Sequence, residues 1–353
     1  MKIEADTKLD FHNVLIRPKR STINSRSEVD VTRSFRFPNV EMRDRDGTIM
    51  KKHWTGVPII SANMDSTGTF EVCECLSSYN MVTALHKFYT IEDYKRFHDK
   101  QISPDSFMIS TGINNDAITH LKEIFKVINC NWICIDIANG YISNLVEFCK
   151  KVRDEFPNKI IVAGNVVTRE IVEELILNGK VDVVKVGIGP GSACTTRLKT
   201  GVGMPQLSAV LECADAAHGV GGHIISDGGI TCPGDMAKAF GGGADFVMVG
   251  GRFAGHDQNP GEVEEIDGKK YKFFHGMSSD KAQQTHYGKM EKYRASEGRV
   301  LKIPYKGDLN ETVQDYLGGL RSTCTYINAS SMKNMAKCTT FIRVSQQVND
   351  LFK

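Results

Sequence analysis

The segment with the clearest chemical potential spans residues 187–206 and reads GIGPGSACTTRLKTGVGMPQ. It places one cysteine, Cys194, beside Thr196 and Arg197 in a glycine-rich stretch. The thiolate of a cysteine is a strong nucleophile, and a neighbouring cation or an orienting hydroxyl raises the thiolate fraction. The segment therefore predicts nucleophilic, covalent catalysis by Cys194.

Two other interpretations of this segment carry less weight. Its glycines superficially suggest a dinucleotide-binding fingerprint, but the third glycine is misplaced and no apolar helix follows directly. A buried, inert Cys194 is disfavoured by its polar and glycine-rich neighbours. We expect that structural role for the other nine cysteines, which form no CxxC pair and no zinc-ligand spacing: Cys73, Cys75, Cys130, Cys134, Cys149, Cys213, Cys232, Cys324 and Cys338.

Two glycine pairs predict a phosphate site. One pair follows Asp227 as Gly228-Gly229, and the other is Gly250-Gly251. Both come directly after apolar runs that read as the seventh and eighth strands of a repeat. Glycine lets backbone amides approach phosphate oxygens closely, although a single pair would equally suit a tight turn. Two pairs at two adjacent strand ends favour phosphate binding.

The elements that must position these residues recur along the chain. Short apolar, β-rich runs predict strands at residues 57–61, 82–85, 107–110, 132–136, 160–163, 183–186, 223–226 and 246–249. Helical spacing is clearest at residues 116–128, 143–156, 168–178, 205–218 and 233–240. Strands that alternate with helices indicate a parallel sheet, and eight such units predict an α/β fold of the (β/α)8 TIM barrel type. An open, doubly wound sheet is the competing arrangement.

Two segments fall outside the repeat. Residues 43–53 are charged and predict a surface loop. Residues 253–306 interrupt the last strand–helix unit with a polar insertion that contains a strand-like piece at 271–274, and so long an excursion predicts a functional lid. Because no linker or low-complexity tract divides the chain, we expect one domain over residues 1–353, with an N-terminal arm at 1–55 and the lid at about 253–306.

Composition narrows the class of protein. The 353 residues are 41% hydrophobic and 24% charged, which is typical of a soluble globular protein with a large core. A net charge of +2 and the lack of a basic run with interleaved aromatics predict no nucleic-acid partner. No window approaches eighteen apolar residues, so we expect no membrane span. The charged first residues, MKIEADTKLDFHNVL, do not suit a secretory signal and favour a cytoplasmic location.

Four motifs in order, GIGPGSACTTR, SDGG, GGGADFVMVGG and GMSS, resemble the family of inosine monophosphate dehydrogenases and guanosine monophosphate reductases. The similarity extends from LDFHNVLIRPKRST near the start to CTTFIRV near the end. This resemblance implies a barrel, a covalent cysteine adduct at purine C2, a nicotinamide cofactor and, commonly, a homotetramer.

The lid resembles that of the reductase branch. Dehydrogenases of the family usually carry an inserted regulatory domain, for which the predicted strands leave no room, and they activate water with an arginine–tyrosine pair. Here the order is reversed, Tyr293-Arg294, within EKYRASEGR. The resemblance therefore implies NADPH-dependent reductive deamination of GMP to IMP; the NAD-dependent oxidation of IMP to XMP is the alternative. Departures from the commonest reductase pattern, which bear on the shape of the lid, are Ala193, Met204, Arg252, His286 and Tyr287.

The same resemblance assigns roles to individual residues. Cys194 is the implied nucleophile, and Thr196 with Glu297 is the implied proton relay for the departure of ammonia. Taken alone, Glu297 reads as a solvated lid acid and Thr196 as a loop hydroxyl bonded to backbone. The implied contacts of the ribose and phosphate are Asp227, Gly228, Gly229, Gly250 and Gly251. Those of the base are Gly276, Met277, Ser278, Arg294, Ala295, Ser296, Glu297 and Gly298.

Cofactor and cation contacts are implied in the same way. The cofactor set is Lys87, Asp136, Ile137, Ala138, Gly189, Met277, Tyr293, Arg294, Ser322, Thr323, Cys324 and Thr325, with Ser25 and Arg26 reaching the cofactor of a neighbouring subunit. An arginine suits the 2′-phosphate of NADPH. The carbonyl groups of Gly189, Gly191 and Cys194, with Arg197 beside them, resemble a loop that binds potassium, a hard cation that favours oxygen ligands.

Overall fold

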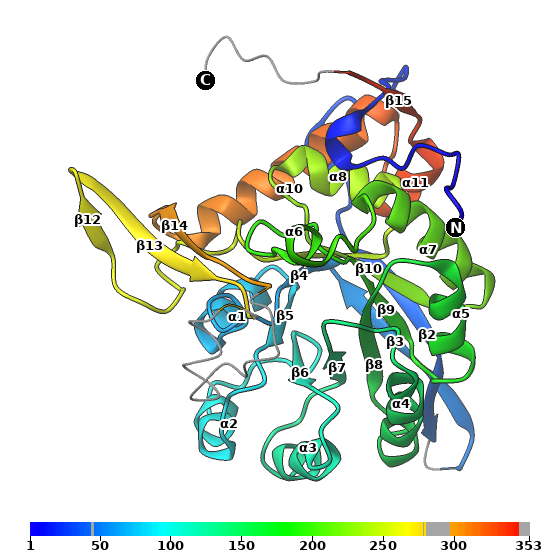
Figure 1. Ribbon diagram of the computed structural model, residues 1–353, viewed down its shortest axis with the longest axis vertical. Helices are drawn as coiled ribbons and strands as arrows, with labels where there is room; N and C mark the ends of the chain where they lie inside the picture. The colour runs from blue at the N-terminus through cyan, green and yellow to red at the C-terminus, as the bar shows by residue number, and fades with distance from the viewer. Residues whose placement is uncertain (44–45, 278, 280–296, 346–353) are drawn as a thin grey trace.

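Eight parallel strands close into a barrel at the centre of the molecule (Figure 1). The computed structural model of the chain describes residues 1–43, 46–277, 279 and 297–345. Each strand pairs with the next along the chain, and the last pairs with the first. The predicted (β/α)8 barrel is therefore confirmed. The barrel strands are β4 (Ile59–Ser61), β5 (Val82–Leu85), β6 (Phe107–Thr111), β7 (Trp132–Asp136), β8 (Ile160–Val166), β9 (Val183–Val186), β10 (His223–Asp227) and β11 (Phe246–Val249).

The barrel strands are apolar along most of their length because both of their faces are covered. All residues of β4, β5, β6, β9 and β11 are buried. Polar residues gather where the strands end, and Asp136 of β7 and Asp227 of β10 are two of them. This distribution is expected of parallel strands that lie under a ring of helices, and it places the chemistry at the carboxyl end of the barrel.

A ring of helices surrounds the barrel, and the predicted helices are confirmed to within one or two residues at each end. Local sequence sets several boundaries: Thr90 caps α2 together with Asp93, and Pro233 occupies the first turn of α8. The ring contains α1 (Phe70–Ser77), α2 (Ile91–His98), α3 (Ala117–Val127), α4 (Ser143–Glu155), α5 (Arg169–Leu177), α7 (Gln206–Gly219), α8 (Pro233–Gly241) and α10 (Leu309–Ile327).

The prediction of a surface loop at residues 43–53 is wrong for Arg43 and for residues 49–53, which lie in strands. Residues 49–53 belong to β3 (Ile49–Gly56), which pairs with β2 (Arg33–Arg43) in an antiparallel hairpin. The hairpin covers the amino end of the barrel, where Trp54 packs edge-on against Trp132, 5.9 Å between ring centroids. A two-stranded ribbon needs only one apolar face, so charged side chains along the other face do not indicate a loop.

The two ends of the described chain meet beside α10. Strand β1 (Val14–Ile16), which follows the short helix η1 (Phe11–Asn13), pairs with β15 (Phe341–Arg343). The turn η2 (Arg26–Glu28) contacts α10, and the backbone amide of Thr22 donates a 3.0 Å hydrogen bond to Asn328. The remaining short elements are η3 (Met332–Asn334) and α11 (Met335–Cys338).

The predicted lid contains a three-stranded antiparallel sheet that projects to one side of the barrel in Figure 1. Its strands are β12 (Glu264–Ile266), β13 (Lys269–His275) and β14 (Val300–Pro304), and β13 lies in the middle. The strand-like piece predicted at residues 271–274 is part of β13. Within the described part of the chain, no helix is both long enough and apolar enough to cross a membrane.

Candidate active site

Cys194 lies in the loop that follows β9, at the carboxyl end of the barrel. The loop leads into the short helix α6 (Thr196–Thr200) and turns back on itself, since the amide of Cys194 donates a 3.1 Å hydrogen bond to the carbonyl oxygen of Gly191. The Cys194 side chain is partly buried. The thiol thus occupies the end of the barrel at which such folds carry out chemistry.

The other cysteines are less uniform than predicted. Six are buried, and burial raises the pKa of thiols such as those of Cys134 and Cys213 to about 12. Cys232, however, is exposed, and Cys75 and Cys338 are only partly buried. The prediction of a buried structural role is therefore wrong for Cys232, which occupies the N-cap position of α8 and faces solvent. All ten cysteines are free thiols.

Cys194, Thr196 and Glu297 form one chain of polar contacts. The Sγ atom of Cys194 lies 3.2 Å from Oγ1 of Thr196. The Thr196 hydroxyl donates a 2.6 Å hydrogen bond to Oε2 of Glu297, which is 101 residues away in the sequence. Each of these side chains is partly buried. A proton can pass between the sulfur and the carboxylate through the hydroxyl, because a hydroxyl both donates and accepts.

Backbone pairing holds Glu297 in this place. The amide of Thr195 donates to the Glu297 carbonyl at 2.8 Å, and the amide of Arg299 donates to the Ala193 carbonyl at 3.0 Å. Cys194 and Gly298 form an antiparallel bridge between these two hydrogen bonds. The segment that returns from the lid is therefore a short strand paired with the cysteine loop.

Gly276 permits the lid to approach the cysteine loop this closely. A Cβ atom at this position would lie 2.8 Å from the carbonyl oxygen of Ala193 and 3.1 Å from Cα of Gly298. Both neighbours are backbone atoms that cannot rotate away. Glycine is the residue that fits such a backbone-to-backbone contact.

The two glycine pairs face the cysteine loop from both sides. Gly228, whose φ of +91° is left-handed, packs against Pro190, and Gly251 packs against the hydroxyl of Ser192. Across the described chain, no hydrogen bond engages the four amides of the two pairs. Converging amides without a protein acceptor suit an anion, so the geometry agrees with the predicted phosphate site. The pairs are Gly228-Gly229 and Gly250-Gly251.

Asp227 is held by two side chains that the sequence-based prediction missed. Its Oδ2 atom accepts a 2.7 Å hydrogen bond from Lys185 and a 2.9 Å hydrogen bond from Asn165. Its Oδ1 atom takes no hydrogen bond from the described residues, and the side chain is 19% exposed. One carboxylate oxygen is thereby fixed and the other remains available to hydroxyl groups of a ligand.

Lys185 also joins this carboxylate to a second one. Its Nζ atom lies 2.7 Å from Oδ1 of Asp136 as well as 2.7 Å from Oδ2 of Asp227. Burial alone would lower the pKa of Lys185, but the two carboxylates raise it above its usual range. Burial would raise the pKa of Asp136, whereas Lys185 and, to a smaller extent, Lys87 lower it. The three groups are therefore a charged network at neutral pH.

The residues assigned to the cofactor separate into two groups. One group follows the carboxyl ends of the strands: the amide of Ile137 donates to Gly164, and Ala138 continues the same loop. Met277 belongs here too, since its sulfur accepts a hydrogen bond from the amide of Asp65. The members of this group are Lys87, Asp136, Ile137, Ala138, Gly189 and Met277.

The second group lies where the N-terminal arm meets α10. Ser25 caps η2, which contacts α10, and Arg26 is the first residue of that turn. Cys324 is completely buried within α10, so its thiol faces the core and neither the thiol nor the backbone is exposed to a ligand. The members of this group are Ser25, Arg26, Ser322, Thr323, Cys324 and Thr325.

The predicted potassium loop has a fixed shape. Gly189 adopts a left-handed φ of +82° and packs against the side chain of Arg197. The Arg197 guanidinium donates to the carbonyl oxygens of Ile188 and Met204. Its positive charge is thus bonded to neighbouring carbonyl groups rather than to those of Gly189, Gly191 and Cys194. Five predicted site residues, Ser278, Tyr293, Arg294, Ala295 and Ser296, lie outside the described residues.

The sequence contained signals for the missed side chains. Lys185 interrupts the otherwise apolar run VVKV, and a lysine inside a buried strand requires a partner. Asn165 follows the apolar run IIVAG, at the end of β8. Neither could be assigned a partner without the register that places β8, β9 and β10 side by side.

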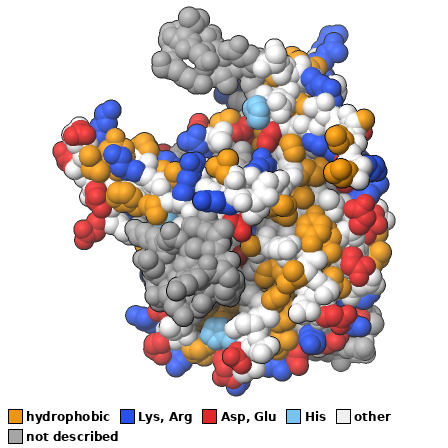
Figure 2. Space-filling model, in the orientation of Figure 1, with side chains coloured by type: hydrophobic (Ala, Val, Ile, Leu, Met, Phe, Trp, Pro, Cys, Tyr) orange, Lys and Arg blue, Asp and Glu red, His pale blue; other side chains and the backbone are white. Residues whose placement is uncertain are grey.

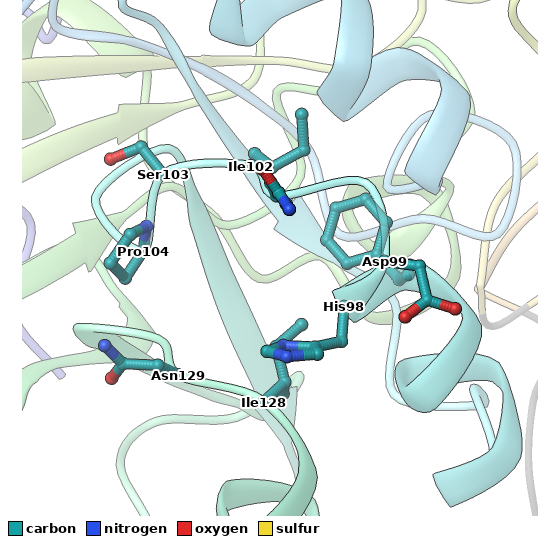
Figure 3. A pocket seen from close by; sticks show the side chains of 9 residues that line it. His98, Asp99, Ile102, Ser103, Pro104, Ile128 and Asn129 are labelled. Atoms are coloured by element: carbon teal, nitrogen blue, oxygen red, sulfur yellow. The ribbon is translucent and has the colours of Figure 1, made fainter.

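The molecular surface carries two further features. Figure 2 shows Lys and Arg side chains gathered across the middle of one face, next to the lid sheet. A separate pocket lies between the carboxyl ends of α2 and α3 (Figure 3). Its residues precede β6 and β7, so it lies at the amino end of the barrel, away from Cys194. Its lining includes His98, Asp99, Ile102, Ser103, Pro104, Ile128 and Asn129.

The chain is similar in sequence to known proteins over nearly its whole length. Residues 8–349 match the IMP dehydrogenase / GMP reductase domain. The chain is 55% identical to GMP reductase 2 of Homo sapiens, over 99% of this chain and 98% of the human protein. It is 54% identical to GMP reductase of Caenorhabditis elegans, over 99% of this chain and 96% of the other. GMP reductase of Buchnera aphidicola is also 54% identical, over 100% and 99%.

Proposed function

Because this chain belongs to the family of IMP dehydrogenases and GMP reductases, we propose that it is a GMP reductase. The reaction converts GMP to IMP with consumption of NADPH and release of ammonia, and it serves purine salvage and interconversion in the cytoplasm. The observation that carries this proposal is the contact from Cys194 through Thr196 to Glu297. It joins a nucleophile to a proton carrier, which is what the removal of an amino group requires.

Cys194 acts as the nucleophile in the first step. Its sulfur bonds to C2 of the guanine ring, and the thiol proton passes through the Thr196 hydroxyl to the carboxylate of Glu297. An amine is a poor leaving group until it is protonated, so Glu297 next returns that proton through Thr196 to the 2-amino group. The C2–N bond breaks, ammonia leaves, and a thioimidate remains between Cys194 and C2.

The second step removes the sulfur. When bound, the reduced nicotinamide supplies the hydride that C2 requires. The electron pair of the C–S bond then returns to Cys194, whose thiolate is a far better leaving group than a serine alkoxide. The product is IMP, and the sulfur is ready for another turnover after a proton is taken up from solvent.

Residues around the thiol hold GMP in position. The free amides of Gly228-Gly229 and Gly250-Gly251 suit the phosphate, and the open oxygen of Asp227 suits the ribose hydroxyl groups. Gly276 approaches the cysteine loop from the lid, and both it and the adjacent Met277 would border the base. Holding the purine against the sulfur makes the attack effectively intramolecular, which accounts for a large part of typical enzymatic rate enhancement.

The residues present also suit a nicotinamide dinucleotide. Asp136 and Lys87 lie at the carboxyl end of the barrel with opposite charges, able to accept from and donate to a polar ligand. Ser25 and Arg26, on the surface beside α10, would reach the cofactor of a neighbouring subunit in a homotetramer. An arginine in that position favours the 2′-phosphate of NADPH over NADH.

A potassium ion suits the carbonyl groups of Gly189, Gly191 and Cys194. Carbonyl oxygens are the hard ligands that an alkali cation favours, and the fixed turn from Gly191 to Cys194 brings the group together. Arg197 would act there by holding the loop, because its guanidinium is already bonded to Ile188 and Met204.

An assay of purified protein tests the proposal. With GMP and NADPH, we expect loss of the absorbance of reduced nicotinamide and release of one ammonia for each IMP formed. The alternative, IMP dehydrogenase activity, predicts formation of NADH and XMP from IMP and NAD. Turnover in the second assay and none in the first would reverse the assignment.

A further inference from the structure

One lysine of the lid, which the proposed mechanism does not use, contacts the loop that follows β11. The chain leaves the barrel after β11 through Gly250–Ala254 and returns from β14 at residues 305–307. At the point of return, Nζ of Lys306 contacts three carbonyl oxygens of the outgoing loop. These belong to Ala254 at 2.7 Å, Arg252 at 3.0 Å and Gly251 at 3.4 Å.

The direction of the Gly251 carbonyl group determines the direction of the Arg252 N–H group. A peptide group is planar and trans, so its C=O and N–H bonds point to opposite sides. The Gly251 carbonyl turns toward Lys306, and the N–H of Arg252, in the same peptide plane, therefore turns away from it. That amide and the amide of Gly251 donate no hydrogen bond within the described chain, whereas the next amide, of Phe253, is already bonded to Gly250.

The same loop borders the cysteine loop. A Cβ atom built on Gly251 would lie 3.0 Å from Oγ of Ser192, two residues before Cys194. The loop thus has a rear face of carbonyl groups bonded to Lys306 and a front, turned away from Lys306, that carries the free amide of Arg252; Gly251 lies beside Ser192 of the cysteine loop. An ammonium group behind the peptide dipoles strengthens their positive ends at the front.

We propose that Lys306 is a positioning residue that orients the Gly250–Ala254 loop for the phosphate of the nucleotide, without contacting the nucleotide itself. This inference rests on the proposed function for the identity of the ligand, a purine nucleoside monophosphate. If Lys306 acts only on the phosphate, it increases the affinity for a nucleotide and leaves the affinity for a nucleoside without phosphate unchanged.

The surroundings of Lys306 make this contact sensitive to pH. Burial and the neighbouring charge of Arg252 lower the pKa of Lys306 to about 8. His256 is a further titratable group near it; burial lowers the pKa of His256 to about 4, so it is neutral above that pH. A bound dianionic phosphate favours the charged ammonium, and affinity for the nucleotide must therefore fall as pH rises through the pKa of Lys306.

Lys306→Met tests the proposal, with Lys302→Met as the matched control. Lys302 lies on β14, is exposed, and contacts only the ring face of Tyr271 among the described residues, so its loss removes the same charge from the same lid. Equilibrium binding of GMP and of guanosine is measured for each variant without cofactor. We expect Lys306→Met to weaken GMP binding about tenfold and guanosine binding by less than about twofold. Lys306→Arg should restore most of the GMP affinity.

A measurement on the unmodified enzyme covers the case in which Lys306→Met fails to fold. The ratio of GMP to guanosine affinity is compared at about pH 7.5 and about pH 9, between which the phosphate stays almost entirely dianionic because its second pKa is about 6. The ratio should fall for the natural protein and remain constant for Lys306→Arg. Equal weakening of both ligands by Lys306→Met, or a ratio independent of pH, overturns the proposal. Because binding is read without turnover, absence of GMP reductase activity would contradict the proposed function separately.

Discussion

The hydroxyl of Thr196 donates a 2.6 Å hydrogen bond to the carboxylate of Glu297, which belongs to the far end of the lid. The barrel contributes the nucleophile and the hydroxyl, and the lid contributes the acid. The lid segment is paired with the cysteine loop through the bridge between Cys194 and Gly298. This backbone pairing fixes the position of the Glu297 carboxylate beside Thr196. The chemistry of the site can be tested one group at a time.

Replacement of Cys194 by alanine should abolish turnover but leave nucleotide binding intact, because the thioimidate cannot form. We expect the rate to fall by at least about a thousandfold. Turnover is followed by loss of NADPH, and GMP binding by calorimetry. The matched control is Cys232→Ala, at the exposed N-cap position of α8, which should retain full activity. Appreciable turnover of Cys194→Ala would contradict covalent catalysis.

Glu297→Gln should slow the release of ammonia more than the transfer of hydride, because only the amine needs a proton to leave. A loss of about 10²–10⁴-fold is expected for the deamination step. The reverse transfer, from IMP to the oxidised cofactor, reports on hydride alone. Thr196→Val should show the same selectivity and Thr196→Ser should largely retain activity. Equal loss in both half-reactions would remove Glu297 from the relay.

Lys185→Met should destabilise the fold and weaken both ligands, because it leaves two partly buried carboxylates, Asp136 and Asp227, without the buried cation between them. Breaking a buried ion pair in this way costs about 3 kcal/mol. Urea unfolding and the affinities for GMP and cofactor measure the two effects. Lys199→Met, at an exposed position on α6, is the control. The double variant Lys185→Met/Asp136→Asn should be more stable than Lys185→Met alone. Equal stability would show that the unneutralised carboxylates do not cause the loss.

Gly276→Ala should lower activity at least about tenfold with little effect on overall stability, because the added methyl group would press the lid away from the cysteine loop. Initial rates and thermal unfolding are measured together. Gly318→Ala, at a position on α10 with open space around it, should leave the rate unchanged. An unaltered rate in Gly276→Ala would show that the close approach is not needed for catalysis.

Stability should depend on pH through Asp245 and His223 at the amino end of the barrel. Burial would lower the pKa of His223, but the Asp245 carboxylate, 3.6 Å away, raises it. The stability contributed by a raised histidine is complete below its unfolded pKa of about 6.5 and is lost as pH rises through the higher folded value. Burial alone would raise the pKa of Asp245, but two histidines hold it well below its usual range, so its contribution to stability is lost only in strong acid.

Urea unfolding across the neutral range measures this dependence. The free energy of unfolding should decline above about pH 6.5 in the natural protein. Asp245→Asn should flatten that decline, whereas Asp215→Asn, at an exposed site, should not. A profile that is unchanged by Asp245→Asn would assign the decline to other groups.

The barrel was predictable because its strands are buried on both faces, which leaves continuous apolar runs such as WICI before Asp136 and VMV before Gly250. The nucleophile was predictable because a cysteine among glycines and hydroxyl residues does not resemble a core residue. The hairpin was not predictable, since a ribbon that covers a barrel with Trp54 on one face leaves its other face charged. Lys185 and Asn165 depend on the register between strands, a property of the sheet rather than of any one segment.

The antiparallel bridge between Cys194 and Gly298 has a consequence for redesign of the lid. Side chains alternate along paired strands, so a slip of a single residue at this bridge would turn the carboxylate of Glu297 toward the opposite side. Insertions or deletions elsewhere in the excursion are tolerable only while this pairing is preserved. Chimeras that exchange lids between related enzymes should therefore be joined outside residues 297–299, and aligned on this bridge rather than on total length.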